Sequence, residues 1–169
     1  KTDPCNSDSD MDGVADGVEM GRTTTVNPAC GTRFVADAEP GSKTDPTLAD
    51  TDGDGISDGA EDKNRDGKVD PGESNPLKRD SDCDGIADND EVSGALGCMT
   101  DPLKLDTDGD GLPDGLEQGL QMPGADPGML PLHCVYTAGM FDADPASKTP
   151  ACNADADGDG IQDGAEDAN

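Results

Sequence analysis

The chain is poor in the residues that build a hydrophobic core. Trp is absent, there is one Tyr and there are two Phe, and Leu, Ile, Val and Phe together number 22 of 169 residues. So little apolar surface cannot offset the conformational entropy that is lost when the backbone becomes ordered. Composition alone therefore indicates disorder, and a folded state needs a source of stability other than a core.

Basic residues and long apolar runs are also scarce. Eleven Lys and Arg stand against 39 Asp and Glu, which gives a formal net charge of −28. Without a basic face the chain cannot neutralise a phosphate backbone, so nucleic acid is excluded as a partner. No apolar run approaches the roughly 20 residues of a membrane-spanning helix, so no membrane span is expected. No signal peptide precedes Lys1, and we expect a mature, exported chain.

The sequence lacks a recognisable catalytic constellation as well. His133 is the only histidine, and no motif places a serine or cysteine nucleophile beside it. The glycines near Gly53 and Gly109 do not have the GxGxxG spacing of a phosphate-binding loop, and the intervening aspartates would repel phosphate. We predict that the protein is not an enzyme.

What the sequence does contain is a repeated acidic motif. Six copies of DxDxDGxxDxxE, or a close variant, occupy residues 8–19, 50–61, 62–73, 80–91, 106–117 and 155–166, and we name the loops by these ranges. Position 6 is glycine and position 12 is glutamate in every copy. Positions 1, 3, 5, 7, 9 and 12 carry Asp8, Asp10, Asp12, Val14, Asp16, Glu19; Asp50, Asp52, Asp54, Ile56, Asp58, Glu61; Asp62, Asn64, Asp66, Lys68, Asp70, Glu73; Asp80, Asp82, Asp84, Ile86, Asp88, Glu91; Asp106, Asp108, Asp110, Leu112, Asp114, Glu117; and Asp155, Asp157, Asp159, Ile161, Asp163, Glu166.

This spacing suits a calcium site. A cation of calcium's size binds six to eight oxygens at roughly 2.3–2.6 Å, and such a loop supplies them from side chains at positions 1, 3 and 5, the carbonyl of position 7 and a bidentate glutamate at position 12. Glycine at position 6 permits the sharp turn. The aspartate at position 9 can bind the ion directly, bind it through water, or cap the next turn. An acidic run that only solvates a surface would not keep glycine and glutamate in register, so calcium is the predicted cofactor.

The segments before the loops separate this chain from EF-hand proteins. Thr-Asp-Pro at residues 44–46 and 100–102 precedes loops 50–61 and 106–117, where an EF-hand has an incoming helix, and proline disfavours that helix. The pattern TDPxxxDTDGDGxxDGxE instead resembles the thrombospondin type 3 repeat of bacterial secreted and cell-surface proteins, over about half of the chain. The resemblance implies an aperiodic chain wound around a row of calcium ions, in a matrix, adhesion or envelope-spacer role, and it implies no activity. Met11 and Cys83 depart from the pattern, because they replace glycine at position 4.

We therefore expect a mostly irregular coil organised around a row of calcium ions, with short one- to two-turn helices and little strand, in a thrombospondin type 3-like elongated array. The whole chain, 1–169, should form this single array, with insertions at about 20–43 and 118–148. Aspartate at position 9 followed three residues later by glutamate is typical of a capping box and predicts a short helix at the end of loops 50–61, 106–117 and 155–166. Strand is expected only as a hairpin within 23–35 and a single strand at 135–137.

The six cysteines favour disulfides. Their even number and the absence of a CxxC pair indicate three bridges in an oxidising compartment rather than a zinc site. Six cysteines allow 15 connectivities, among which short closure favours Cys5 with Cys30, Cys83 with Cys98, and Cys134 with Cys152. Cys83, inside loop 80–91, could also ligate a soft metal, but a disulfide is the preferred interpretation.

Together these features predict a secreted or cell-surface calcium-binding structural protein, stiffened by its ions and acting as an extracellular spacer or scaffold, and bacterial in origin. The alternative is a subunit of a calcium-stabilised extracellular filament assembled head to tail, because residues 1–13 and 148–160 match at identical spacing. A calcium buffer is disfavoured, since a buffer would be cytosolic and free of disulfides. The expected partners are calcium ions, and either copies of the chain itself or other components of the extracellular surface.

Overall fold

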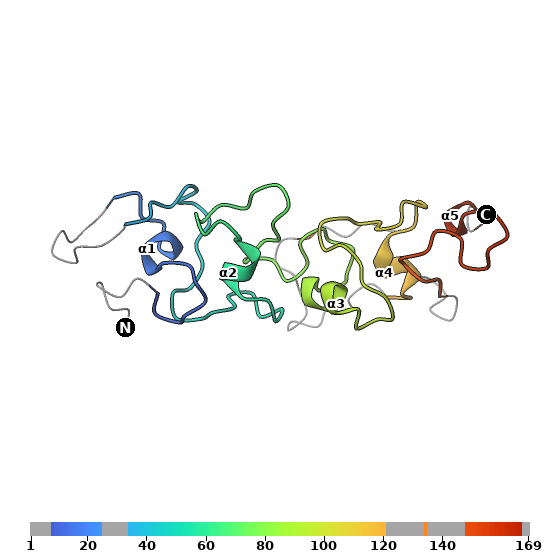
Figure 1. The fold of residues 1–169 in the computed structure, drawn as a ribbon, viewed down its shortest axis with the longest axis horizontal. Coiled ribbons are helices and arrows are strands. Elements are labelled where there is room, and N and C mark those ends of the chain that lie inside the picture. The colour runs from blue at the N-terminus through green and yellow to red at the C-terminus, as the bar shows by residue number, and fades with distance from the viewer. Residues whose placement is uncertain (1–7, 25–33, 121–133, 135–147, 167–169) are drawn as a thin grey trace. The chain divides into compact units, whose positions relative to one another are not determined.

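The computed structural model describes residues 8–24, 34–120, 134 and 148–166, and these residues form irregular coil with five short helices (Figure 1). The helices are α1 (Asp16–Glu19), α2 (Asp58–Glu61), α3 (Asp88–Ser93), α4 (Asp114–Glu117) and α5 (Asp163–Glu166). No strand occurs among the described residues. The prediction of a mostly irregular coil with short helices is confirmed. Most of the predicted hairpin and the whole strand at 135–137 lie outside the described residues.

The chain divides into two compact units, Lys1–Arg79 and Asp80–Asn169. The first unit contains loops 8–19, 50–61 and 62–73, and the second contains loops 80–91, 106–117 and 155–166. The division falls between two loops and interrupts none of them. That all six loops form one elongated array stays a prediction.

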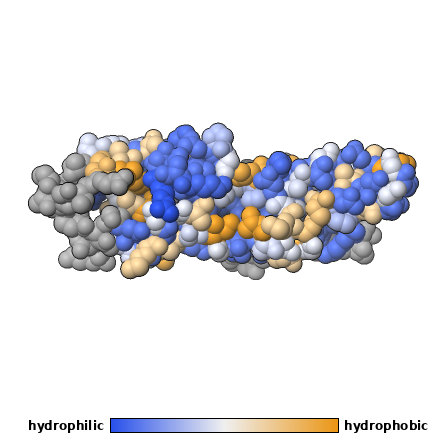
Figure 2. All heavy atoms as spheres, in the orientation of Figure 1, coloured by the Kyte–Doolittle hydropathy of each residue, from blue (hydrophilic) through white to orange (hydrophobic). Residues whose placement is uncertain are grey.

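The buried residues of both units are mainly acidic. Val14, Val18, Ile86 and Ala151 are the only buried hydrophobic residues in the described part of the chain. By contrast, the largest side chains that are less than 2% exposed are, apart from Val18, all carboxylates: Glu19, Glu61, Glu91, Asp58, Asp84, Asp88 and Asp114. The surface in Figure 2 is hydrophilic with apolar patches between the polar areas. Burying unpaired carboxylates is costly, so positive charge inside the fold is needed to compensate for these buried carboxylates.

Each helix begins at the aspartate in position 9, which differs in detail from the predicted capping box. The residue before it, such as Ser57 in front of α2, is extended and makes no side-chain capping hydrogen bond. The same absence of a side-chain cap holds for α1, α3 and α4. The capping-box prediction is therefore wrong for α2 and α4, although the positions of the three predicted helices, α2, α4 and α5, are right. None of the described helices has the length and apolar character needed to cross a membrane.

Candidate metal centres

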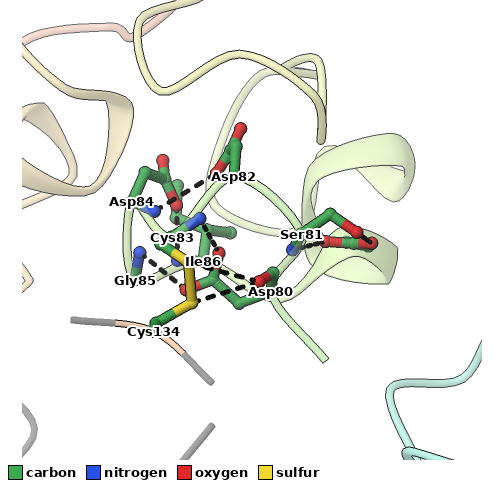
Figure 3. The surroundings of a disulfide bond; sticks show 9 residues. Asp80, Ser81, Asp82, Cys83, Asp84, Gly85, Ile86 and Cys134 are labelled. Carbon is green, nitrogen blue, oxygen red and sulfur yellow. Dashed lines mark hydrogen bonds between the residues drawn. A yellow bond between two sulfur atoms is a disulfide. The ribbon is translucent and has the colours of Figure 1, made fainter. Parts of the chain in front are cut away.

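All six loops share one set of local hydrogen bonds, which loop 80–91 illustrates (Figure 3). The carboxylate of Asp80 at position 1 accepts the N–H of Cys83 at 2.6 Å and the N–H of Gly85 at 3.0 Å. Asp82 accepts the N–H of Asp84 at 3.2 Å, and Asp84 accepts the N–H of Ile86 at 2.6 Å. The same bonds, from positions 4 and 6 to position 1, from 5 to 3 and from 7 to 5, recur in the other five loops. The spacing of the motif thus fixes the loop before any tertiary contact is made.

This loop requires positive φ at positions 4 and 6. Position 6 is always glycine, with φ between 81° and 106°. The only described non-glycine residues with positive φ are Met11, Arg65 and Cys83, at 68°, 60° and 70°, and all three stand at position 4. A side chain in this region costs on the order of 1–2 kcal/mol. Loops with glycine at position 4, such as loop 106–117, avoid that cost.

Several carboxylate oxygens in the loops are buried without a hydrogen-bond partner. At position 3 they are Oδ2 of Asp10, Asp82 and Asp108, and at position 12 they are Oε2 of Glu19, Glu91 and Glu117. These oxygens belong to the same three loops, 8–19, 80–91 and 106–117. Positions 3 and 12 are both positions at which a calcium loop supplies ligands. Carboxylate oxygens of Asp80, Asp82 and Asp84 also lie within 4.8 Å of one another, as do those of Asp8, Asp10 and Asp12 and those of Asp50, Asp52 and Asp54. The residues present therefore fit a hard cation.

Burial and mutual repulsion raise the pKa of these carboxyl groups. Burial is the largest cause for Glu91, whose pKa is raised to about 10, and the charges of Asp82 and Asp84 raise it further. The same causes raise the pKa of Glu19 and Glu117 to about 8. With no cation bound, the folded loops therefore favour protonated glutamates, and a cation that binds must displace these protons.

The aspartate at position 9 closes the loop on itself. Asp58 accepts the backbone N–H of Thr51 at position 2 at 2.7 Å and the hydroxyl of Thr51 at 2.6 Å. Asp16 and Asp88 receive both bonds from a serine in the same way, and Asp114 and Asp163 receive the N–H. Of the three roles open to this position, capping is excluded for α1 to α4. Direct or water-mediated binding through the remaining lone pairs stays a prediction.

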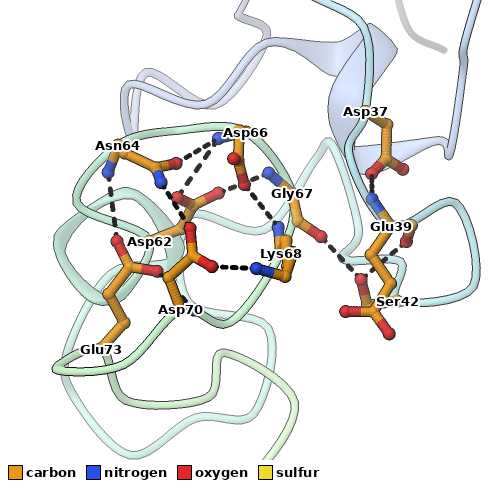
Figure 4. A network of polar contacts seen from close by, with 10 residues as sticks. All are labelled: Asp37, Glu39, Ser42, Asp62, Asn64, Asp66, Gly67, Lys68, Asp70 and Glu73. Atoms are coloured by element: carbon orange, nitrogen blue, oxygen red, sulfur yellow. Dashed lines mark hydrogen bonds and ion pairs between the residues drawn. The ribbon is translucent and has the colours of Figure 1, made fainter.

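Loop 62–73 differs from the others because a lysine forms an ion pair within the loop (Figure 4). Lys68 Nζ pairs with Asp70, which also accepts Asn64 Nδ2–H at 2.9 Å. The lysine contact lowers the pKa of Asp70. Glu73 accepts the N–H of Asp70 at 2.9 Å and that of Asn64 at 3.3 Å. Sequence reasoning assigned Lys68 only a backbone carbonyl, and its ammonium group gives this loop an internal positive charge that the other five lack.

The first insertion packs on the same loop. The N–H of Ala38 donates to the carbonyl of Asp66 at 2.7 Å. The hydroxyl of Ser42 donates to the carbonyl of Gly67 at 2.6 Å (Figure 4). Asp37 is 4% exposed and its Oδ2 has no hydrogen-bond partner. Nothing in the motif pointed to Asp37, which sequence analysis missed.

Three pairs of loops stack through the aspartate at position 5 of one loop and the glycine at position 10 of the other. Gly59 N–H donates to Asp12 Oδ2 at 3.0 Å, so that α2 lies on loop 8–19. The same bond joins Gly115 to Asp84 at 3.0 Å and Gly164 to Asp110 at 2.8 Å. A Cβ at these three glycines would lie 2.1–2.4 Å from the backbone carbonyl oxygen of the same aspartates. Glycine is thus required at position 10 wherever one loop rests on another.

A threonine from the segment before each stacked loop binds the glutamate of the loop beneath. Thr100 donates its hydroxyl to Glu91 Oε1 at 3.0 Å and its N–H to the Glu91 carbonyl at 3.2 Å. Thr149 makes both bonds to Glu117, at 3.0 and 3.2 Å, and the Thr44 hydroxyl reaches Glu19 Oε1 at 3.2 Å. Each glutamate thus keeps Oε2 for a cation while its other oxygen ties two loops together. The sequence predicted these segments only as helix breakers.

The structure corrects the predicted disulfides. Cys83 is bonded to Cys134, with 5.4 Å between the Cα atoms, so the predicted pairs Cys83–Cys98 and Cys134–Cys152 are wrong (Figure 3). Loop-closure entropy grows slowly with length, so proximity in sequence was a weak guide. The pair Cys5–Cys30 lies outside the described residues. Cys83 is also unavailable to a soft metal, since its sulfur is in the disulfide.

Cys98 and Cys152 are thiols that contact each other. Burial raises the pKa of Cys98 to about 12, and a hydrogen bond with the Cys152 side chain contributes to the shift.

No protein-family model, curated protein or solved structure matches the chain.

Proposed function

We propose that this protein is an extracellular calcium-binding structural protein in which bound ions hold the stacked loops together. The observation that carries the proposal is the set of buried carboxylate oxygens without a hydrogen-bond partner at positions 3 and 12 of loops 8–19, 80–91 and 106–117. In those loops the candidate ligands are the carboxylates of positions 1, 3, 5 and 12 and the carbonyl of position 7, as the sequence predicts for all six.

Calcium suits this donor set better than other common ions. All the donors are oxygens, they come from a closed protein loop, and their number matches calcium's six to eight ligands. Magnesium usually retains several waters and is held by one or two carboxylates. Zinc and copper prefer nitrogen and sulfur. The only side-chain nitrogens at positions 1, 3, 5, 7, 9 or 12 are the amide of Asn64 and the ammonium of Lys68, which is paired with Asp70.

The stacking contacts explain how calcium would stiffen the chain. Asp84 is both a candidate ligand in loop 80–91 and the acceptor for Gly115 in the next loop. Glu91 likewise serves a candidate site and receives Thr100. An ion that fixes these carboxylates also fixes the loop above, so binding and ordering of neighbouring loops are coupled. This supports a spacer or scaffold role.

The extracellular location rests on two arguments. The Cys83–Cys134 disulfide is typical of oxidising compartments. Extracellular calcium modules bind with dissociation constants of about 10⁻⁴ to 10⁻³ M, which matches loops whose glutamates must first lose protons.

Metal analysis of the purified chain, equilibrated in millimolar calcium, tests the proposal. We expect at least five ions per chain, and two or fewer would refute it. Asp82→Asn should remove one ion, because Asp82 Oδ2 is a buried oxygen with no other partner. Asp90→Asn changes the charge equally in the same loop, at a position that supplies no predicted ligand, and should keep the full number.

A second candidate function, a filament subunit assembled head to tail, is favoured by two stacking surfaces, α1 and loop 155–166, that contact no further loop among the described residues. Gly17 occupies position 10 of loop 8–19, yet the only described side chain that its Cβ would meet within 4 Å is the Phe34 ring at 3.8 Å, so packing among the described residues does not require glycine there. Ile161, at position 7 of loop 155–166, is 50% exposed, whereas Val14 and Ile86 at the same position are 3% and 4% exposed. Inside the chain, the glycine at position 10 of one loop stacks on the aspartate at position 5 of another loop three times. Loop 8–19 offers a further glycine for this contact, and loop 155–166 offers a further aspartate.

In that candidate, loop 155–166 of one copy receives α1 of a second copy, and the Gly17 N–H of the second copy binds Asp159 of the first. A contact of this kind propagates unless it closes into a ring. Light scattering and electron microscopy in calcium should then show filaments or rings, which Gly17→Ala abolishes and Gly41→Ala does not, because a Cβ at Gly41 meets nothing within 4 Å. A protein that stays monomeric at high concentration in calcium would rule the candidate out.

A further inference from the structure

Two described cysteines that belong to no disulfide face each other in the second unit. Cys98 is partly buried, Cys152 is exposed, and the two thiols lie close enough to interact. We propose that Cys98 and Cys152 are a disulfide-forming pair, a redox modification site that joins the segment after α3 to the segment before loop 155–166.

The positions of both cysteines are set by equivalent anchors one loop apart. Cys98 stands two residues before Thr100, which binds Glu91 through its hydroxyl and its N–H. Cys152 stands three residues after Thr149, which binds Glu117 through the same two groups.

Local packing holds the two segments further. Ala151, next to Cys152, is fully buried at 0% exposure, and the N–H of Asn153 donates to the Pro150 carbonyl at 2.9 Å. On the other side, a Cβ at Gly94, which ends α3 in the left-handed region, would lie 3.3 Å from the carbonyl carbon of Cys98. The contact between the thiols thus joins two segments that are each fixed by other bonds.

The disulfide already present favours a crosslink over a metal site. Cys83–Cys134 ties the start of the unit to residue 134 and shows that a long-range bridge is compatible with this fold. A tetrahedral zinc site needs about four nitrogen or sulfur ligands, and the pair supplies two. A Cys98–Cys152 bond would enclose loop 106–117 between its two ends in the sequence.

The reaction needs an oxidant, and a small-molecule disulfide such as oxidised glutathione is sufficient. The thiolate of the more exposed Cys152 attacks one glutathione sulfur, forming a mixed disulfide and releasing one reduced glutathione. Cys98, after losing its proton to solvent, attacks the Cys152 sulfur, forms the protein disulfide and releases the second reduced glutathione. The two protein thiols are oxidised, and one glutathione disulfide is reduced.

Peptide mapping without reduction tests the proposal on the full chain. The protein is equilibrated with oxidised and reduced glutathione in calcium, and its remaining thiols are alkylated. Trypsin and a glutamate-specific protease then cut it after Arg79, Glu91, Lys104, Glu117, Lys148 and Glu166. These cuts put the four cysteines on separate peptides, 80–91, 92–104, 118–148 and 149–166. We expect 92–104 linked to 149–166, 80–91 linked to 118–148, and loss of alkylation at Cys98 and Cys152.

Two variants make the outcome decisive. In Cys152→Ser, Cys98 should be fully alkylated while the 80–91 to 118–148 link remains, which shows that the fold survives. In Cys134→Ser, the link between 92–104 and 149–166 should persist, because it depends on its own anchors. Alkylation of both Cys98 and Cys152 in the oxidised wild-type protein, or a link from either one to any other cysteine, would overturn the proposal.

Discussion

Replacing Gly115 by alanine is the sharpest test of loop stacking. Gly115 is buried in α4, and its N–H donates to Asp84 Oδ2 at 3.0 Å. A Cβ at this position would lie 2.1 Å from the Asp84 carbonyl oxygen and 3.1 Å from its carbon. Both atoms are backbone, so they cannot turn away as a side chain could. The two loops must separate, and the hydrogen bond must lengthen or break.

The magnitude follows from three effects. Overpacking in a close contact costs about 1–3 kcal/mol, and a lost hydrogen bond to a charged group costs about 1.5–3 kcal/mol. Alanine returns up to about 1 kcal/mol, because glycine is the poorer helix former. We expect the free energy of unfolding of the calcium-loaded protein to fall by about 1.5–5 kcal/mol, and calcium affinity to fall at loop 80–91, which contains Asp84.

The assay is urea unfolding at fixed millimolar calcium, followed by circular dichroism in dilute solution. Gly17→Ala is the matched control, since Gly17 has the same position in α1 and its Cβ would meet nothing closer than 3.8 Å. We expect the control to be neutral, or more stable by up to about 1 kcal/mol from helix propensity. Equal losses in the two variants, or no loss in Gly115→Ala, would refute the stacking argument.

Three further predictions concern pH, the position 2 hydroxyl and calcium removal. Without calcium, the pKa of Glu91 is raised from 4.5 to about 10 in the folded state, so its contribution to stability is complete below pH 4.5 and is lost as pH rises toward 10. In chelator, more near-ultraviolet circular dichroism should therefore remain at pH 5 than at pH 7.5, and the reverse order would contradict these shifts. Ser81→Ala removes a 2.7 Å hydroxyl bond to Asp88 and should lower the free energy of unfolding by about 1.5–3 kcal/mol. Ala156→Ser supplies a hydroxyl to the buried, unpartnered Oδ2 of Asp163 and should raise the free energy of unfolding by about 1 kcal/mol. Denaturant unfolding should show these opposite changes in the two variants. Chelation at pH 7.5 with disulfides intact should abolish the near-ultraviolet circular dichroism and the cooperative thermal transition, because the few buried apolar side chains cannot hold the fold.

The sequence predicted what local spacing determines. Carboxylates at positions 1, 3 and 5 bond to N–H groups two to five residues away, so the motif carries its own geometry, and the helices after Asp58, Asp114 and Asp163 begin where expected. The capping box failed for a related reason. A carboxylate at the start of a helix can turn back to position 2 instead of forward to the glutamate, and Thr51, Ser9 and Ser81 offer both an N–H and a hydroxyl there.

Long-range contacts were beyond the same reasoning. The bond between Gly115 and Asp84 spans 31 residues, and the Cys83–Cys134 disulfide spans 51. Neither leaves a local signature, because the partner depends on how many residues the intervening insertion contains and where they return. The threonine before each stacked loop shows the same limit, since its partner glutamate belongs to the preceding stacked loop.

The residue at position 10 nevertheless predicts which loops stack, although position 10 is not a calcium-ligand position and the ligand motif omits it. Gly59, Gly115 and Gly164 each rest on the carbonyl of an earlier loop, where any side chain would clash. Loops 62–73 and 80–91 have Pro71 and Asn89 instead. Proline has no N–H to donate, and asparagine places a Cβ where the carbonyl would lie. Loop 80–91 is also the first loop of the second compact unit, so the missing glycine coincides with the start of a stack.

Loop 8–19 breaks this rule, and the exception bears on function. It is the first loop of its unit, yet it keeps glycine at position 10, with no carbonyl from the described chain against it. Its φ does not lie in the left-handed region, so backbone conformation does not explain the glycine either. In the other three cases glycine marks a loop with a predecessor. By the same physical argument, α1 is suited to a preceding loop that the described chain does not supply. In the filament proposed above, that loop would be loop 155–166 of another copy, in which Ile161 is 50% exposed.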